Sequence, residues 1–85
     1  MEAGEALTPE EEGLFEALRR FRLSEAQERG VPAYVVASDR SLRDIARQRP
    51  DSLRALEECF GIGPAKLEEY GESFLGVVAS FGRHG

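Results

Sequence analysis

The stretch CFGIGPAKLEEYG, Cys59–Gly71, joins two helical patterns through a glycine-rich turn. We expect Gly61 to end the preceding helix with a positive φ, which glycine adopts at little steric cost. Gly63 then caps the next helix, and Pro64 suits its first position, where no N–H donor is needed. The stretch therefore predicts a tight hairpin between two helices, a geometry that can also present backbone N–H groups to a phosphate.

The charges around this turn favour a structural role over phosphate binding. Lys66 offers one positive charge near the loop, and Pro64 removes one of the N–H donors that a phosphate would need. Four nearby carboxylates repel a phosphate. We expect Ile62 to fill the core beneath the turn, and a contact with DNA stays open as the alternative. The four carboxylates belong to Glu57, Glu58, Glu68 and Glu69.

A long helix is expected on the N-terminal side of the chain. Thr8 and Glu11 form a capping box around Pro9, and the helix should run to Arg29 and stop at Gly30. An apolar stripe at helical spacing marks its inner face. The stripe consists of Leu14, Ala17, Leu18 and Phe21.

The apolar segment GVPAYVVAS, residues 30–38, has no second strand to pair with. We expect it to cross the core as a buried loop, with Val35 and Val36 as plugs. Ser38 then caps a helix over about residues 39–49. The inner face of that helix should carry Leu42, Ile45, Ala46 and Arg49.

Two more helices complete the pattern, one from Ser52 to about Cys59 and one from Pro64 to about Phe81. We expect Gly71 and Gly76 to permit close helix contact, although each costs helix propensity. The expected apolar anchors are Leu53, Leu56 and Phe60 in the first and Leu67, Tyr70, Phe74, Val77, Val78 and Phe81 in the second. The sequence thus predicts an all-α, compact bundle of four to five helices over residues 9–82, after a disordered lead-in or linker at 1–8 and before a tail at 83–85.

Composition excludes most catalytic classes. The 85 residues form one small domain, and 41% of them are hydrophobic, too many for a disordered chain. The single cysteine, Cys59, excludes an internal disulfide and a cysteine-cluster zinc site, and His84 lies in the tail without partners. Nucleophile–base pairs and phosphate-binding motifs are missing as well, so we expect no catalytic residue, no metal and no cofactor. No apolar run is long enough for a membrane span, and no signal peptide precedes the domain.

Five stretches follow one another in an order that resembles a known family. They are Leu14–Leu18, VPAYVV at 31–36, SDRSLRDIA at 38–46, PDSL at 50–53 and GIGPAKLEEYG at 61–71. Together they resemble an HRDC domain, the helicase-and-RNase-D C-terminal module. The resemblance covers about residues 9–82 and implies a non-catalytic helical bundle whose GIG turn is like that of a helix-hairpin-helix.

The resemblance also implies a parent protein and a cellular context. The parent is most often a RecQ-family ATP-dependent DNA helicase of repair and recombination, with an RNase D-type 3'–5' exonuclease as the alternative. In such a parent the domain tunes the engagement of particular DNA structures. A bacterial cytoplasmic location near the nucleoid follows, and we expect the isolated domain to be a monomer.

The distribution of charge separates two candidate surfaces. Net charge is −5, but residues 14–54 carry nine arginines against six acids, while both flanks are acidic. Tyr34 occupies a place in VPAYVV where the resemblance implies a contact with single-stranded DNA, and a half-buried ring is the alternative. Basic side chains that adjoin Tyr34 would form a weak platform for single-stranded or branched DNA, or only a solvated face. These side chains are Arg19, Arg20, Arg22, Arg40, Arg43, Arg47 and Lys66.

The second candidate surface is acidic. Its exposed carboxylates would dock on a basic part of the parent helicase or of another protein, or would only keep the domain soluble. A purely protein–protein role is therefore an alternative to DNA contact. The acidic candidates are Glu57, Glu58, Glu68, Glu69 and Glu72.

Overall fold

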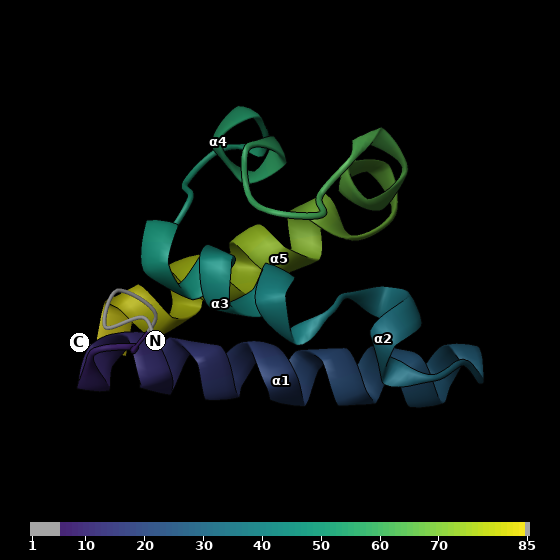
Figure 1. Cartoon of the computed structure of the whole chain (residues 1–85), viewed down its shortest axis with the longest axis horizontal. Helices are drawn as coiled ribbons and strands as arrows, with labels where there is room; N and C mark the ends of the chain where they lie inside the picture. Colours follow the sequence, from purple (N-terminus) through teal and green to yellow (C-terminus); the bar gives the residue numbers. More distant parts are fainter. Residues whose placement is uncertain (1–5, 85) are drawn as a thin grey trace.

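The computed structural model of the chain describes residues 6–84, with side chains described through residue 82. Residues 1–5 of the lead-in expected at 1–8, the side chains of Arg83 and His84, and Gly85 lie outside this description. All regular structure within the described range is helical, which confirms the predicted all-α class. The helices are α1 (Pro9–Arg29), α2 (Ala33–Val36), α3 (Asp39–Gln48), α4 (Leu53–Glu57) and α5 (Pro64–His84) (Figure 1).

Local signals alone set the bounds of α1, and the prediction for it is confirmed. The Thr8 hydroxyl accepts a hydrogen bond from the Glu11 backbone N–H at 3.1 Å, and the Glu11 carboxylate accepts one from the Thr8 N–H at 3.0 Å. The helix ends where Gly30 adopts φ 69°, and the Gly30 N–H closes the last turn on the carbonyl of Ala26.

The segment after α1 is not the loop that the sequence predicted. Residues 33–36 form a single helical turn, α2, and only one of the two expected plugs is buried. Val36 is fully buried, whereas Val35 is 42% exposed. Consecutive side chains on a helix point about 100° apart, so a turn that directs Val36 at the core turns Val35 away from it.

The inner face of α3 was predicted correctly except at its end. Leu42, Ile45 and Ala46 are fully buried. Arg49 instead caps α3 with φ 48°, and its guanidinium lies 3.7 Å from the carboxylate of Glu10 at the surface. The left-handed turn at the cap carries this side chain away from the inner face.

Helix α4 ends at Glu57, earlier than expected, and only Leu56 of its three predicted anchors is buried. Leu53 and Phe60 are 38% and 44% exposed, so the prediction was wrong for both. The chain leaves the helix before Phe60, and the turn that follows places its ring outside the core.

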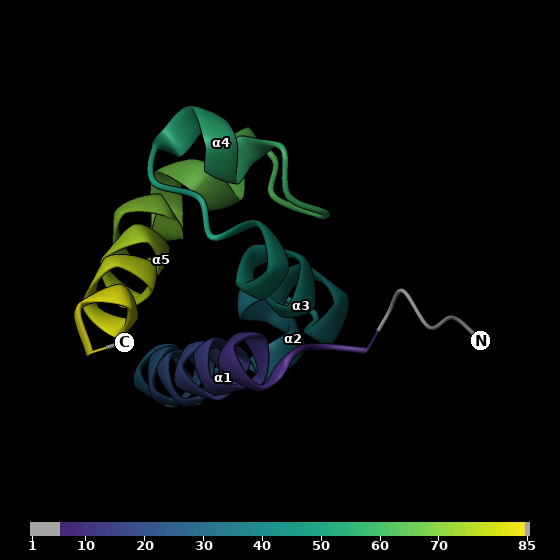
Figure 2. The ribbon, with the colours of Figure 1, turned by 90° about the vertical axis from the view of Figure 1, so that its left-hand side faces the viewer.

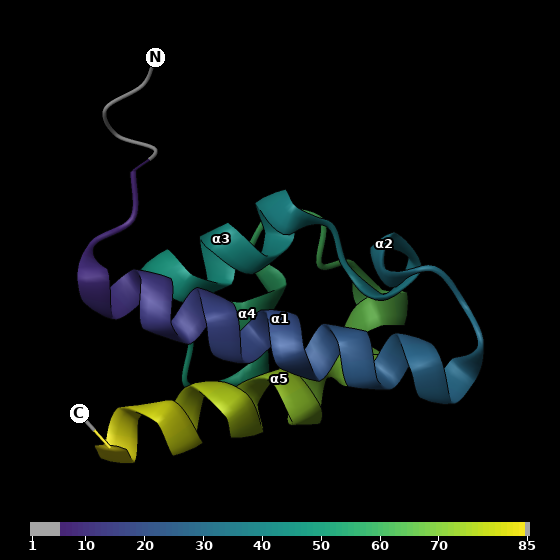
Figure 3. The same cartoon turned by 90° about the horizontal axis from the view of Figure 1, so that it is seen from below.

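The long helices α1 and α5 run antiparallel and side by side, and α3 lies against the other side of α1 (Figures 2 and 3). Helix α4 packs on the first part of α5. The start of α1 and the end of α5 therefore lie at one end of the molecule, and α2 lies towards the opposite end (Figure 1). Helix α5 continues three residues beyond its predicted end at Phe81.

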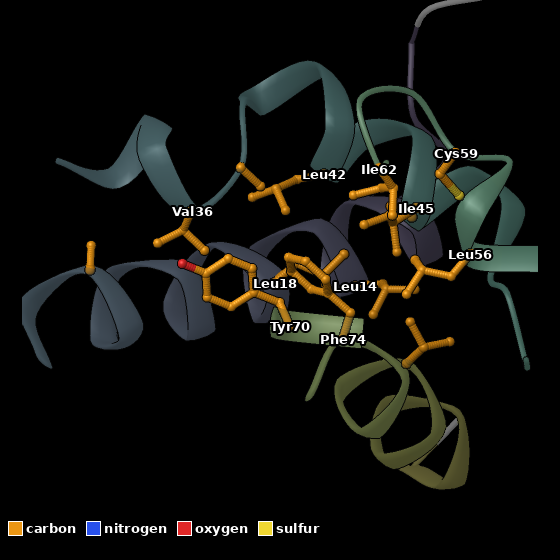
Figure 4. Packing of buried hydrophobic residues seen from close by; sticks show 14 residues of the cluster. Leu14, Leu18, Val36, Leu42, Ile45, Leu56, Cys59, Ile62, Tyr70 and Phe74 are labelled. Atoms are coloured by element: carbon orange, nitrogen blue, oxygen red, sulfur yellow. The ribbon is translucent and has the colours of Figure 1, made fainter. Parts of the chain in front are cut away.

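One hydrophobic core receives side chains from all five helices and from the glycine turn (Figure 4). Phe74 is fully buried at its centre and meets the ring of Phe21 edge-on, with 5.3 Å between the ring centroids. Ile62 is 4% exposed, as the sequence predicted for the residue inside the turn.

The two glycines expected to permit close packing in α5 differ. A Cβ on Gly71 would lie 2.8 Å from Cδ2 of Leu53, so this glycine does allow α4 to approach α5. A Cβ on Gly76 would meet nothing within 4 Å, so the prediction was wrong there.

Candidate nucleic-acid interface

Three arginines lie along one outer face of α3. Arg40, Arg43 and Arg47 recur at helical spacing and line a surface hollow of about 530 Å³. The hollow is also lined by two carboxylates, Asp44 and Glu58, and by the ring of Phe60. Its charge is therefore mixed, with an excess of one positive charge.

Phe60 is a member of this surface that the sequence analysis placed in the core. The guanidinium of Arg40 lies over its ring, 3.9 Å from the ring centroid, which is a cation–π contact. The Phe60 backbone N–H donates to the Asp44 carboxylate at 2.7 Å and holds the residue against α3. The position of Phe60 directly before a positive-φ glycine was the only sequence signal that its ring would leave the helical pattern.

Arginines of α1 and α3 meet at Phe15. Arg19 and Arg43 approach the Phe15 ring from these two helices, at 5.9 Å and 5.6 Å from its centroid. An arginine–aromatic face therefore extends from α1 across α3. We define this face by Phe15, Arg19, Arg40, Arg43, Arg47 and Phe60.

The other two arginines of α1 do not join this face in the same way. Arg20 is exposed and borders a groove between α1 and α5, beside Phe21 and Gly76. Arg22 is largely buried, donates to the backbone carbonyl of Ala37 at 3.0 Å and pairs with Asp39 at 2.8 Å. Its guanidinium is thus used within the fold.

Tyr34 lies on α2 and is 73% exposed, so the alternative of a half-buried residue is wrong. Lys66 reaches the same helix from α5, and its ammonium group donates to the Val35 carbonyl at 2.8 Å. The structure therefore brings Lys66 to the residue next to Tyr34, but through a bond to the backbone.

The glycine turn packs closely against α3. Gly61 has φ 74°, and a Cβ there would lie 2.6 Å from the hydroxyl oxygen of Ser41. That hydroxyl donates to the Phe60 carbonyl at 2.6 Å, and the Ile62 N–H is bonded to the carbonyl of Cys59. These bonds give the turn a structural role in joining α4 to α5.

The five candidate acidic residues are all exposed, and two of them lie close to arginines. Glu69 accepts a hydrogen bond from Arg29 at 2.6 Å, and Arg29 also pairs with Glu25 on its own helix. Glu58 borders the arginine-lined hollow. The remaining members, Glu57, Glu68 and Glu72, have no ion pair among those found in the described residues.

Cys59 is buried beside this region. Burial, together with the smaller effect of the nearby carboxylates of Asp44 and Glu58, raises the pKa of its thiol to about 11. Such a thiol stays protonated and is a poor nucleophile. Within residues 6–84, no three His, Cys, Asp or Glu side chains are grouped to hold a metal ion. None of the described helices combines the length and apolar character that a membrane crossing requires.

Comparison with known proteins agrees with this architecture. A model of the HRDC domain matches residues 11–78. The ATP-dependent DNA helicase UvrD2 of Mycobacterium tuberculosis is 46% identical over 68 residues, which are 80% of this chain and 10% of the helicase. The ATP-dependent DNA helicase RecQ of Bacillus subtilis is 36% identical over 78 residues, which are 92% of this chain and 13% of the helicase.

A solved structure shares the fold. HRDC domain 3 of RecQ from D. radiodurans superimposes with a TM-score of 0.80 at 34% identity, covering 82% of this chain and 92% of that domain. The sequence resemblance suggested a parent of the RecQ or RNase D type, and the UvrD2 relative adds a helicase class that it did not suggest. The chain spans about a tenth of the length of the curated helicases that it matches. On the extent of the family match and the shared fold, this chain belongs to the HRDC domain family.

Proposed function

We propose that this HRDC domain is a non-catalytic module of a DNA helicase of the RecQ or UvrD2 class. It contacts single-stranded DNA weakly and adjusts how the helicase engages branched DNA during repair and recombination. Such a helicase would act in the bacterial cytoplasm, at the nucleoid. An RNase D-type parent stays an alternative.

The arginine–aromatic face carries this proposal. Phe15 and Phe60 each have guanidinium groups within cation–π distance, so apolar rings and positive charges alternate across α1 and α3. Bases stack on aromatic rings and on guanidinium planes, while arginines neutralise phosphates, and neither contact needs a particular base sequence. Tyr34 offers a third ring to a strand that extends beyond this face.

Affinity should be low because few phosphates can be neutralised and the domain as a whole is negative. Its net charge is −5, and Asp44 and Glu58 lie within the arginine-lined hollow. With about three phosphates neutralised, binding to a single strand should weaken with salt at a slope of about −2 in log–log form. Weak contact suits a module that biases a stronger motor domain.

The test is a titration of the 85-residue chain with fluorescently labelled single-stranded, duplex and branched DNA at about 20 and about 100 mM salt. Arg43→Glu should lower affinity about tenfold, because Arg43 lies over Phe15 and lines the hollow. Arg54→Glu changes the net charge equally on α4, outside the arginine–aromatic face, and should have a smaller effect. Absence of binding to any DNA at the lower salt concentration would reject direct contact.

Docking through the acidic residues is the second candidate. Glu57, Glu68 and Glu72 are exposed and could meet a basic surface elsewhere in the parent helicase. Reversing these three charges should then change the DNA affinity of the full helicase, while the isolated domain keeps its own DNA affinity. Unchanged behaviour of the full helicase would reject docking.

A further inference from the structure

Two basic side chains hold α2 at its C-terminal end. Lys66 from α5 donates to the Val35 carbonyl at 2.8 Å, and Arg22 from α1 donates to the Ala37 carbonyl at 3.0 Å. Arg22 also pairs with Asp39 at the start of α3. Side chains from two different helices thus converge on the backbone that immediately follows Tyr34.

Helix α2 needs such support. It has four residues, and its N-cap, Pro32, makes no side-chain hydrogen bond to it. Backbone bonds of the Val35 N–H to the Pro32 carbonyl at 3.0 Å and of the Ala37 N–H to the Ala33 carbonyl at 3.3 Å close the turn. One isolated helical turn is unstable in water, because the conformational entropy lost in fixing several backbone dihedrals outweighs the stabilisation from its few hydrogen bonds.

Both cations are already engaged within the fold. The side chain of Arg22 is only 12% exposed, and Lys66 is half-buried with its ammonium on a carbonyl. Val36 and Ala33 attach the inner side of the turn to the core, while the two cations hold the carbonyls at its end. The direction of the exposed Tyr34 ring therefore depends on where the two donors hold the carbonyls that follow it.

We infer that Arg22 and Lys66 are positioning residues that clamp α2 and thereby set the pose of Tyr34 for stacking on a base. The effect on base stacking rests on the proposed DNA contact. The clamp itself is a property of the domain without DNA. It assigns to two of the predicted phosphate-binding residues a role in the fold, and leaves phosphate contact to the arginines of α3.

The clamp is tested first without DNA. In Lys66→Met the apolar stem is kept and the donor is lost, so amide hydrogen exchange at Val35 and Ala37 should accelerate at least about fivefold, with α1 and α5 unchanged. Lys66→Arg, which keeps a donor, should restore slow exchange. Unchanged exchange in Lys66→Met would overturn the clamp whatever the domain does with DNA.

The consequence is tested with labelled oligothymidine of about 15 nucleotides. Lys66→Met should lower affinity about fivefold and leave the salt slope unchanged, and it should add nothing in a Tyr34→Ala background, because both changes remove the same stacking contact. A direct phosphate contact would instead lower the slope by nearly one unit and add to Tyr34→Ala, which would overturn the inference. If the wild-type chain does not bind, the proposed DNA contact fails, and the exchange measurement still decides the clamp.

Discussion

Phe60 and Phe74 have the same side chain, but one lies at the surface and the other in the core. Phe74 is fully buried between α1 and α5, whereas the Phe60 ring is 44% exposed beneath the guanidinium of Arg40. Burial of an aromatic ring supplies stability, while a ring at the surface is free to contact a partner. The first residue belongs to the fold, and the second is available for binding.

Truncating the two rings should separate these roles. Phe74→Ala should lower the free energy of unfolding by about 3–5 kcal/mol, because it leaves a cavity in the core. Phe60→Ala should cost less than about 1.5 kcal/mol, since half the ring already meets water. Urea denaturation followed by circular dichroism measures both, and equal losses would contradict the assignment of Phe60 to the surface.

Cys59 should make stability depend on alkaline pH. Its thiol has a pKa raised to about 11 from an ordinary value of 9.0, so the folded state holds this proton more tightly than the unfolded state does. The resulting stability is present below pH 9 and is lost as the pH rises towards 11.

The measurement compares the wild-type chain with Cys59→Ala, which removes the titrating group. The stability advantage of the wild type should shrink by on the order of 1 kcal/mol between about pH 8 and about pH 10.5. All other ionisable groups are the same in both proteins, so their contributions cancel in the difference. A constant difference over this range would contradict the raised pKa.

At the scale of the elements, the glycine turn determines how α4 joins α5. Gly61 requires the left-handed conformation and touches the Ser41 hydroxyl that holds the Phe60 carbonyl. Gly76, in the middle of α5, has neither constraint. Substitution by alanine should therefore have opposite effects on stability at Gly61 and at Gly76.

Gly61→Ala should destabilise the domain by about 2 kcal/mol or more, because alanine is strained at this φ and its Cβ displaces the Ser41 hydroxyl. Gly76→Ala should stabilise it by about 0.5–1 kcal/mol, because alanine is the better helix former and has open space there. Chemical denaturation of both variants provides the check. If Gly76→Ala lowered the free energy of unfolding as much as Gly61→Ala does, the conformation of the turn would not be the cause of the loss at Gly61.

The same elements show how far sequence reasoning can reach. Helix α1 was predicted at both ends, because its capping box and Gly30 act within a few residues of each end. Helix α2 was missed, because Arg22 and Lys66, distant in sequence, supply the donors that hold it. Local sequence patterns predict helix ends that neighbouring residues fix, but not a helix that distant side chains hold.

The candidate site shows the same division. The basic side chains of α3 could be placed on one face from their spacing alone. Their aromatic partners could not, because the contact of Arg43 with Phe15 depends on how α3 crosses α1. Phe60 reached the surface only through the turn that follows α4.

At the scale of the whole molecule, a single core connects all the helices. Val36, Ile45, Leu56 and Phe74 come from four different helices and pack in one cluster with Leu18 of α1. Among the side chains described up to residue 82, the buried apolar ones form this one cluster. We therefore expect the domain to unfold as one unit.

Unfolding by urea should give coincident transitions from two probes. Circular dichroism reports the helices, and tyrosine fluorescence reports the core through Tyr70, which is 7% exposed. Tyr34→Phe removes the signal of the exposed tyrosine and serves as the control. Separate midpoints in this variant would show that α4 and the start of α5 open before the rest.

The antiparallel course of α1 and α5 has a consequence for any longer polypeptide that contains this domain. Chain entering at the start of α1 and leaving after α5 would connect at one end of the domain, while α2 lies towards the other end (Figures 1 and 3). The α2 end of the domain would then lie away from both connections to the rest of the polypeptide. Rotation of the domain about these two connections could bring the α2 end to a nucleic-acid strand.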